Sequence, residues 1–229
     1  MADLYLVLLH HPVLDKTGMI VTSALTNMDI HDIARSARTY GVRRFYVATP
    51  VKALHALAAK IMEHWDTGYG STYNVTRKDA LSLVRLEYDL DSTMVTLERE
   101  TGLRPRLVAT SARGGVNRTR FDDLRTQMAT SSEPHLIMLG TGWGLAPEVT
   151  DRADVTLEPI WGPTDYNHLS VRSAAAIILD RLRGARKEAD SLKIEAGSIG
   201  CRLFSQYILH PQILSNPRWP DEHHRYDRA

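Results

Sequence analysis

Hydrophobic and polar positions along residues 1–184 follow two alternating periods. Apolar runs of strand length, at residues 4–9, 19–23, 44–48, 106–110, 135–139 and 155–157, are separated by stretches in which apolar residues recur at helical spacing. Helices are expected at residues 29–40, 50–64, 77–86, 91–100, 121–128 and 169–182. Strands joined through helices form largely parallel sheets with helices on both faces, so the pattern predicts an α/β fold.

The helix expected at residues 29–40 illustrates how the pattern sets the limits of an element. Ile30 and Ile33 lie three positions apart and place apolar side chains on one helix face. Asn27 precedes this helix and is a residue type that caps a first turn, while Gly41 is typical of a helix end. The segment is therefore predicted to be an amphipathic helix packed on the sheet.

The periodic pattern stops after Gly184. Residues 185–229 begin with charged side chains and contain three prolines, which interrupt helices. A short amphipathic helix near residues 199–208 is the one element that this composition predicts. We expect a domain at residues 1–184 and a partly disordered extension that docks on the domain or reaches a partner subunit.

The composition favours one soluble cytoplasmic domain. With 229 residues, 43% of them hydrophobic, the chain can bury one sizeable core. Its single cysteine, Cys201, cannot form a disulfide within the chain, and no basic-then-apolar leader precedes Asp3. No apolar run approaches the roughly 20 residues of a membrane-spanning helix, so no membrane association is expected.

Net charge gives little indication of a nucleic-acid partner, because the chain carries only +1 at pH 7. Any RNA contact must therefore depend on local clusters of arginine. Two such clusters occur, one around Arg35 and Arg38 and one formed by Arg113, Arg118 and Arg120. A short cluster of charges is also typical of an ordinary solvated surface, and the sequence leaves both interpretations open.

A glycine-rich loop follows the strand expected at residues 135–139. Gly140, Gly142 and Gly144 would let backbone amides approach a nucleotide-like ligand, at the sheet edge where open α/β folds bind ligands. A dinucleotide-binding fold would place such a loop after its first strand, whereas here it follows the fifth. A tight turn that needs glycine for its backbone angles explains the spacing equally well.

Three segments resemble, in order and spacing, the signatures of the SPOUT superfamily of α/β-knotted RNA methyltransferases. The first, TNMDIHDIARSARTYGV at residues 26–42, fits the signature at Asp29, Arg35, Ala37, Gly41 and Val42. The second covers residues 137–145 and the third residues 157–182. The resemblance extends over residues 1–184 and is strongest to a bacterial branch whose members also occur joined to the tRNA guanine-N1 methyltransferase domain.

The resemblance implies a homodimer with a deep C-terminal trefoil knot around S-adenosylmethionine, each active site being completed by the partner chain. The implied activity is methyl transfer from S-adenosylmethionine to structured RNA, with tRNA as the expected substrate. The residues expected at the cofactor belong to the second and third signatures: Leu139, Gly140, Thr141, Gly142, Gly144, Leu145, Ile160, Gly162, Leu169 and Ser170.

The same analogy places Arg35 against the acceptor nucleotide. A guanidinium has a pKa above about 12, so binding phosphate is its ordinary behaviour and acting as a base is not. Asp29 or Asp32 is a candidate proton acceptor if it lies near the methyl group. The alternatives are an ion pair between Arg35 and Asp32 on the helix surface, and carboxylates that simply complement the helix dipole.

RNA contacts are expected from basic side chains near these motifs: Arg38, Arg113, Arg118, Arg120 and His11. Trp143 and Trp161 can stack on a base, although aromatic packing in a core is commoner. The histidines lack the spacing of metal ligands, so no metal site is expected.

Departures from the family's motifs leave the methylated atom open. Related ribose methyltransferases have asparagine where this chain has Asp29, glutamate at Gly142, and Ser-Leu-Asn at His168, Leu169 and Ser170. Cofactor binding rests largely on backbone groups and is expected to survive these changes. Two other functions stay open: a knotted module that binds cofactor or RNA without catalysis, and a nucleotide-dependent oxidoreductase.

Overall fold

A computed structural model describes residues 2–68, 72 and 74–185 of the chain. Residues 1–185 make up one compact unit. The short helix expected near residues 199–208, and the rest of the C-terminal extension, lie outside the described residues.

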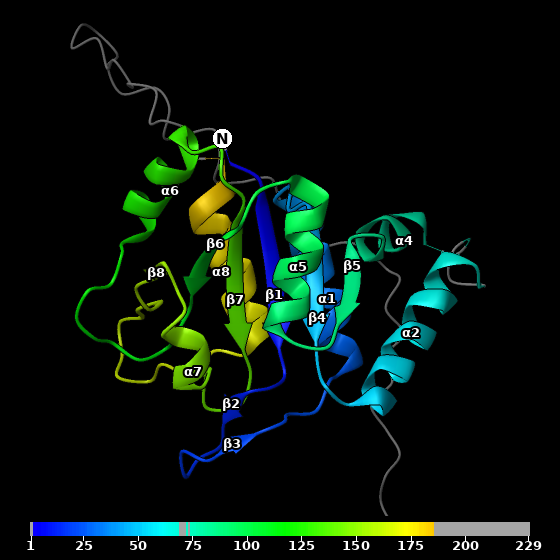
Figure 1. Cartoon of the computed structure of the whole chain (residues 1–229), viewed down its shortest axis with the longest axis horizontal. Coiled ribbons are helices and arrows are strands. Elements are labelled where there is room, and N and C mark those ends of the chain that lie inside the picture. The colour runs from blue at the N-terminus through cyan, green and yellow to red at the C-terminus, as the bar shows by residue number, and fades with distance from the viewer. Residues whose placement is uncertain (1, 69–71, 73, 186–229) are drawn as a thin grey trace, which may run out of the picture. The chain divides into compact units, whose positions relative to one another are not determined.

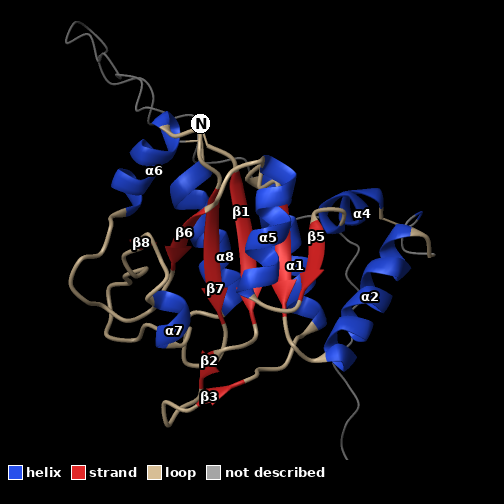
Figure 2. Cartoon of the chain, in the orientation of Figure 1, coloured by secondary structure: helices blue, strands red, loops and turns tan. Residues whose placement is uncertain are grey.

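Six parallel strands form the main sheet, in the spatial order β5-β4-β1-β7-β6-β8 (Figures 1 and 2). They are β1 (Leu4–Leu9), β4 (Arg44–Ala48), β5 (Val84–Glu87), β6 (Arg106–Ala109), β7 (His135–Gly140) and β8 (Val155–Thr156). A small antiparallel hairpin consists of β2 (Val13–Leu14) and β3 (Ile20–Val21). The helices are α1 (Asn27–Thr39), α2 (Lys52–Asp66), α4 (Val75–Leu81), α5 (Leu90–Thr101), α6 (Phe121–Thr130), α7 (Pro147–Thr150) and α8 (Val171–Arg183).

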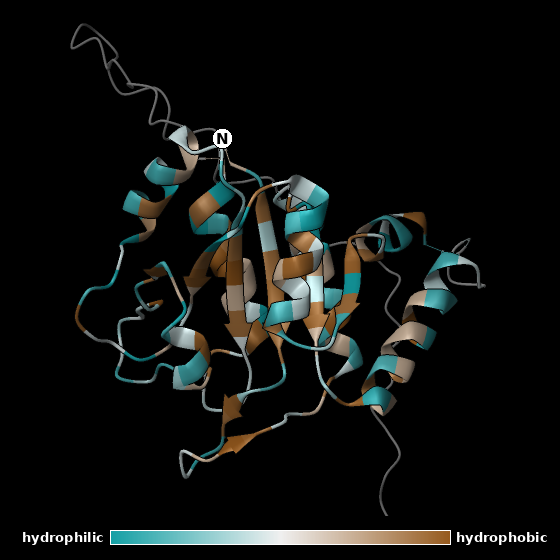
Figure 3. Ribbon diagram, viewed as in Figure 1, coloured by the Kyte–Doolittle hydropathy of each residue, from teal (hydrophilic) through white to brown (hydrophobic). Residues whose placement is uncertain are grey.

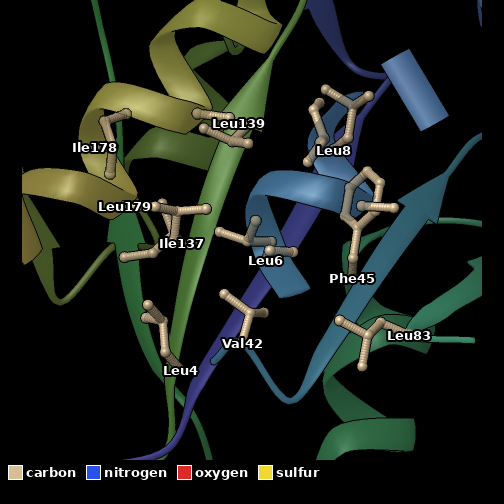
Figure 4. Close-up of a cluster of buried hydrophobic side chains, with 14 of the residues drawn as sticks. Leu4, Leu6, Leu8, Val42, Phe45, Leu83, Ile137, Leu139, Ile178 and Leu179 are labelled. Carbon is tan, nitrogen blue, oxygen red and sulfur yellow. The ribbon is translucent and has the colours of Figure 1, made fainter. Parts of the chain in front are cut away.

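Helices cover both faces of this sheet, which confirms the predicted fold class. Successive side chains of a strand point to opposite faces. Leu6 on β1 therefore packs in the core that α1, α2, α4, α6 and α8 cover, whereas its neighbour Val7 packs in the core beneath α5 and α7. Figure 4 shows Leu6 and Ile137 of the first core beside Leu179 of α8. The sheet strands are accordingly the most apolar elements in Figure 3.

The prediction of a helix at residues 77–86 is wrong for the second half of this segment. Helix α4 ends at Leu81, and β5 begins at Val84 and pairs with Phe45 of β4. Val84 is buried while the next residue, Arg85, is exposed, which is the alternation of a strand at the edge of a sheet. Because the segment is short, pairing with β4 decides its conformation rather than its local apolar spacing.

Two smaller predictions near the N-terminus also need correction. The cap of α1 is Thr26, whose side chain accepts a hydrogen bond from the backbone of Asp29, and Asn27 is the first helical residue. The strand expected at residues 19–23 is confined to β3 and belongs to the hairpin rather than to the main sheet.

Candidate cofactor site

A cavity of about 710 Å³ opens at the carboxyl ends of β6, β7 and β8. Its volume lies within the range of small-molecule sites. Three loops supply most of its lining, after β6 (residues 110–113), after β7 (140–145) and between β8 and α8 (157–170), and α8 closes it with Val171, Ala174 and Ile178. The predicted ligand edge of the sheet therefore carries a cavity of suitable size.

Nine of the ten residues predicted to contact the cofactor line this cavity: Leu139, Gly140, Thr141, Gly142, Gly144, Leu145, Ile160, Leu169 and Ser170. The tenth, Gly162, is exposed and is not among the lining residues. Ser170 also caps α8 by accepting a hydrogen bond from the backbone of Ser173, at 3.2 Å. The third motif thus forms one cavity wall and the start of α8 together.

The glycine loop is held by backbone hydrogen bonds to the β2 hairpin. Trp143 donates to the carbonyl of Leu14 at 2.9 Å, and Leu14 donates to the carbonyl of Gly144 at 2.9 Å. Gly142 has a φ of +59°, and a Cβ atom on it would lie 2.8 Å from the Leu14 oxygen. Any residue other than glycine would push the loop away from β2. The glutamate that related enzymes carry at this position has no room here.

A chain of hydroxyl groups connects the centre of the sheet to the same loop. His10, which follows β1 and is fully buried, has its Nδ1 atom 2.9 Å from the Ser23 hydroxyl. The Ser23 hydroxyl is in turn hydrogen-bonded to the Thr141 hydroxyl, and Thr141 lines the cavity. Burial lowers the pKa of His10, against an opposing effect of Asp29, so the imidazole is neutral near pH 7.

Several lining residues were not predicted, and they come from segments remote from the glycine loop: Thr110, Ser111, Ala112, Glu158, Asn167 and His168. Asn167 donates from Nδ2 to the carbonyl of Ala112 at 2.8 Å, which ties two walls of the cavity together. Thr110 and Ser111 directly follow β6, so their place at the carboxyl end of a strand was the one signal that could have found them.

Charged groups around the cavity are few and of both signs. Arg113, predicted to bind RNA, donates from Nη2 to the carbonyl of Trp143 at 3.2 Å and lines the cavity. Asp165 and Glu158 are the acidic lining residues, and the carboxylate of Glu158 accepts a hydrogen bond from the backbone of Phe121 at 2.9 Å. The cavity is therefore not a strongly charged site.

The three residues predicted to be catalytic lie on α1, and none of them lines the cavity. Asp29 is buried, with 8% of its surface exposed, and lies 3.4 Å from Nε of Arg172 on α8. Asp32 pairs with the same guanidinium at 3.3 Å, so the alternative ion pair with Arg35 is wrong. Arg35 is exposed and has no ion-pair partner among the described residues.

The other basic residues predicted to bind RNA are not brought together. Arg38 forms an ion pair with Asp79 at 2.7 Å on α4, and His11 has its Nδ1 atom 3.1 Å from the hydroxyl of Thr22. Arg118 lies against Gly115 within the loop after β6, and the exposed Arg120 precedes α6. Of the five, Arg113 is the one that the fold places at the cavity.

Comparison with known proteins bears on this cavity. A family model described as SAM-dependent RNA methyltransferase matches residues 3–184, which is most of the chain. The chain belongs to this family. Membership confirms the resemblance inferred from the three motifs, and S-adenosylmethionine is therefore the methyl donor and RNA the methyl acceptor of this family member.

Similar proteins occur in several bacteria. An uncharacterized protein of Aquifex aeolicus is 42% identical over 180 residues, which are 79% of this chain and 88% of that protein. A protein of Oleidesulfovibrio alaskensis named tRNA (guanine-N(1)-)-methyltransferase is also 42% identical, over 182 residues. That match covers 80% of this chain but 42% of the relative, so more than half of the relative lies outside it.

Solved structures share the fold at low sequence identity. A "probable methyltransferase" of Bordetella pertussis aligns with a TM-score of 0.53 and 16% identity, covering 80% of this chain and 95% of the other. A "probable methylase family protein" of Haemophilus influenzae aligns with a TM-score of 0.52 and 15% identity, covering 80% and 65%. These likenesses support the α/β architecture.

Neither a metal cluster nor a membrane-spanning helix occurs in the described residues. No three His, Cys, Asp or Glu side chains of this part of the chain are grouped as a metal ion would require. None of its helices combines the length and apolar character that crossing a membrane demands.

Proposed function

We propose that this member of the family methylates tRNA, using S-adenosylmethionine bound in the cavity at the ends of β6, β7 and β8. The observation that carries the proposal is the convergence of the second and third motifs on that one cavity. The name of the Oleidesulfovibrio relative supports tRNA as the substrate class, although the activity in that name belongs to a longer protein.

The lining suits the chemistry of S-adenosylmethionine. Leu139, Leu145 and Ile160 offer apolar walls for an adenine ring, and the glycine loop brings backbone groups close to the ligand. The amino-acid part of the cofactor carries both charges, and Asp165 and Arg113 provide a partner for each. We assign the nine lining residues named above to the cofactor and leave Gly162 outside this set.

Bound S-adenosylmethionine supplies an activated methyl group attached to a sulfonium. Transfer would exchange the sulfur–carbon bond for a bond from the methyl carbon to an oxygen or nitrogen of the nucleotide, and the proton of that acceptor would pass to water. Arg35 positions the nucleotide through its phosphate. Asp29 and Asp32 are both engaged by Arg172, which supports a role in fixing α1 against α8 rather than in accepting the proton.

The place of Arg35 supports a homodimer. This side chain is exposed on α1, and the cavity is lined without any residue of that helix. A second copy that presents its own Arg35 to the cavity would complete the site, so we propose an isologous dimer. We also propose the C-terminal knot, supported by the contact of Asn167 with Ala112, and a cytoplasmic location, where tRNA is found.

Calorimetry with S-adenosylhomocysteine, followed by transfer of tritiated methyl groups to separated tRNA and ribosomal RNA, tests the proposal. We expect binding to the wild type and loss of binding in Ala174→Phe, which adds a ring to a residue of α8 that lines the cavity. Label in ribosomal RNA alone would contradict the choice of tRNA. Absence of cofactor binding by the wild type would contradict the site.

Mixing two inactive variants tests the dimer. Arg35→Ala keeps an intact cavity, and Ala174→Phe keeps an intact Arg35. Random pairing places half of the copies in mixed dimers with one complete site each, so activity should return to about a quarter of the wild-type value. A mixture that stays inactive, although native mass spectrometry shows mixed dimers, would show that Arg35 serves its own chain's cavity or none.

A further inference from the structure

Four aromatic side chains stand around the mouth of the cavity. Trp143 and His168 line it, Tyr166 contacts the ring of His168, and Trp161 directly follows the lining residue Ile160. We call these four residues the aromatic rim. Trp143 is 53% exposed, Trp161 61% and Tyr166 75%, which is unusual for side chains that normally bury large apolar surfaces.

The rings of the rim leave faces open. His168 meets Trp143 at a ring distance of 6.3 Å and Tyr166 at 5.3 Å, with interplanar angles of 69° and 71°. In an edge-to-face contact one ring presents its edge and the other ring one of its two faces, so the remaining faces stay free for stacking. Tyr88, elsewhere on the surface and 52% exposed, instead stacks on His55 at 4.5 Å and 17°. The rim therefore offers ring faces for stacking, whereas one face of Tyr88 is already covered by His55.

Cationic groups accompany these rings. Arg113 uses one nitrogen for the backbone carbonyl of Trp143, so it keeps donors for a further acceptor near that residue. The next residue, Gly114, lies so close to Trp161 that a Cβ atom there would be 3.5 Å from the indole. The loop after β6 thus contacts both exposed tryptophans, Trp143 through the Arg113 guanidinium and Trp161 through Gly114.

We infer that the aromatic rim stacks on unpaired bases, so that the RNA substrate presents its acceptor nucleotide from a single-stranded segment and not from a duplex. Bases that are splayed out of a helix are recognised by stacking on aromatic and guanidinium groups, with backbone phosphates held by arginine. The inference rests on the proposed function, because a nucleotide must reach the cavity through this mouth. A protein partner seated on the rim would close that path.

Binding of fluorescently labelled RNA in the presence of S-adenosylhomocysteine tests the inference, with one strand offered alone and then annealed to its complement. The wild type should prefer the single strand. Trp143→Ala and Trp161→Ala should each weaken single-strand binding about 5- to 100-fold, because that is the usual effect of removing a stacking ring. Trp143→Phe should retain most of the affinity, and Tyr88→Ala is the matched control that should change nothing.

Equal affinity of the wild type for single strand and duplex would overturn the inference, as would unchanged single-strand binding in both tryptophan variants. A change of oligomeric mass in Trp161→Ala, measured by sedimentation, would show instead that a second copy covers the rim. Calorimetry with S-adenosylhomocysteine on Trp161→Ala, whose side chain does not line the cavity, separates the two proposals. Unaltered cofactor binding with altered RNA preference concerns the rim, whereas a wild type that binds no cofactor defeats the proposed function.

Discussion

The cavity and the outer face of α1 present their chemistry in different ways. The cavity is lined by glycines, apolar side chains and uncharged polar side chains, with few charged groups. The face of α1 carries Asp32, Arg35 and Arg38 on a regular helix, and none of these residues lines the cavity. One region can enclose a ligand and the other can contact a charged one.

In the proposed mechanism, this difference separates binding of the cofactor from positioning of the RNA substrate. A sulfonium already carries an activated methyl group, so its site needs shape and close backbone approach more than strong charges. An RNA phosphate needs a guanidinium instead. Because these two regions lie on different elements, point variants can change one region at a time and so test the proposed shared site.

Replacing Arg35 by alanine should have the largest effect. We expect methyl transfer to fall at least about 100-fold, because interactions made mainly in the transition state reduce turnover when removed. Affinity for S-adenosylhomocysteine should stay within about twofold, since Arg35 does not line the cavity. Arg104→Ala, at another exposed arginine, is the control. A parallel loss of cofactor affinity would show that the two regions act as one.

Gly142→Ala should damage the cavity and leave α1 intact. The positive φ and the approach to the Leu14 carbonyl together should cost about 2–4 kcal/mol in the free energy of unfolding and weaken cofactor binding about tenfold. Gly18→Ala is the control, because Gly18 has a φ of +84° but no atom within 4 Å of the place that its Cβ would take. Its cost should be about 1 kcal/mol. Similar losses in both variants would mean that the approach to β2 is not restrictive.

Arg172→Met removes the ionic link between α8, which lines the cavity, and α1. It leaves the buried Asp29 without its cationic partner, so urea unfolding should show a loss of about 1–3 kcal/mol. The double variant Arg172→Met, Asp29→Asn should recover part of that loss. Arg38→Met, whose ion pair with Asp79 is about half exposed, should cost less than about 1 kcal/mol. No recovery in the double variant would count against a buried ionic link.

The smallest expected effect concerns two histidines, His10, which is connected to the glycine loop through Ser23, and His31 of α1. Burial lowers the pKa of His10 and of His31 from 6.5, so the unfolded chain binds protons more readily than the folded one. Stability from this source is present above about pH 6.5 and is lost as the pH falls below it, by at most about 1.4 kcal/mol per pH unit for each group. His10→Asn should reduce the loss more than His31→Asn, because His10 is fully buried. Urea titrations at neutral and mildly acidic pH measure the free energy of unfolding. An equal dependence on pH in both variants would contradict the larger effect expected of His10.

Much of the fold could be predicted from local patterns. The apolar run of β7 and the amphipathic spacing of α1 each depend on neighbours in sequence, and both elements formed close to the expected limits. The strand β5 could not be predicted in this way, because its conformation depends on pairing with β4 some forty residues earlier.

Residues of the site likewise fall into those that local sequence predicts and those that depend on long-range contacts. The glycine loop was found because its residues are contiguous, whereas Thr110 and Asn167 reach the cavity through strand order and a contact between loops. The pairing of Asp32 with Arg172 joins residues 140 positions apart, so it displaced the local pairing with Arg35 that helix spacing suggested. Side-chain roles that depend on long-range partners are the part that a single sequence does not reveal.

The backbone hydrogen bonds between the glycine loop and β2 also have a consequence for timing. Trp143, Gly144 and Ala146 are each bonded to Leu14 or Pro12, so the loop cannot swing aside unless residues 12–14 move with it. Spent cofactor must leave and fresh cofactor must enter once per turnover, and in many enzymes such a release step limits the rate. The small hairpin near the N-terminus would then set the pace of a reaction whose atoms it never touches.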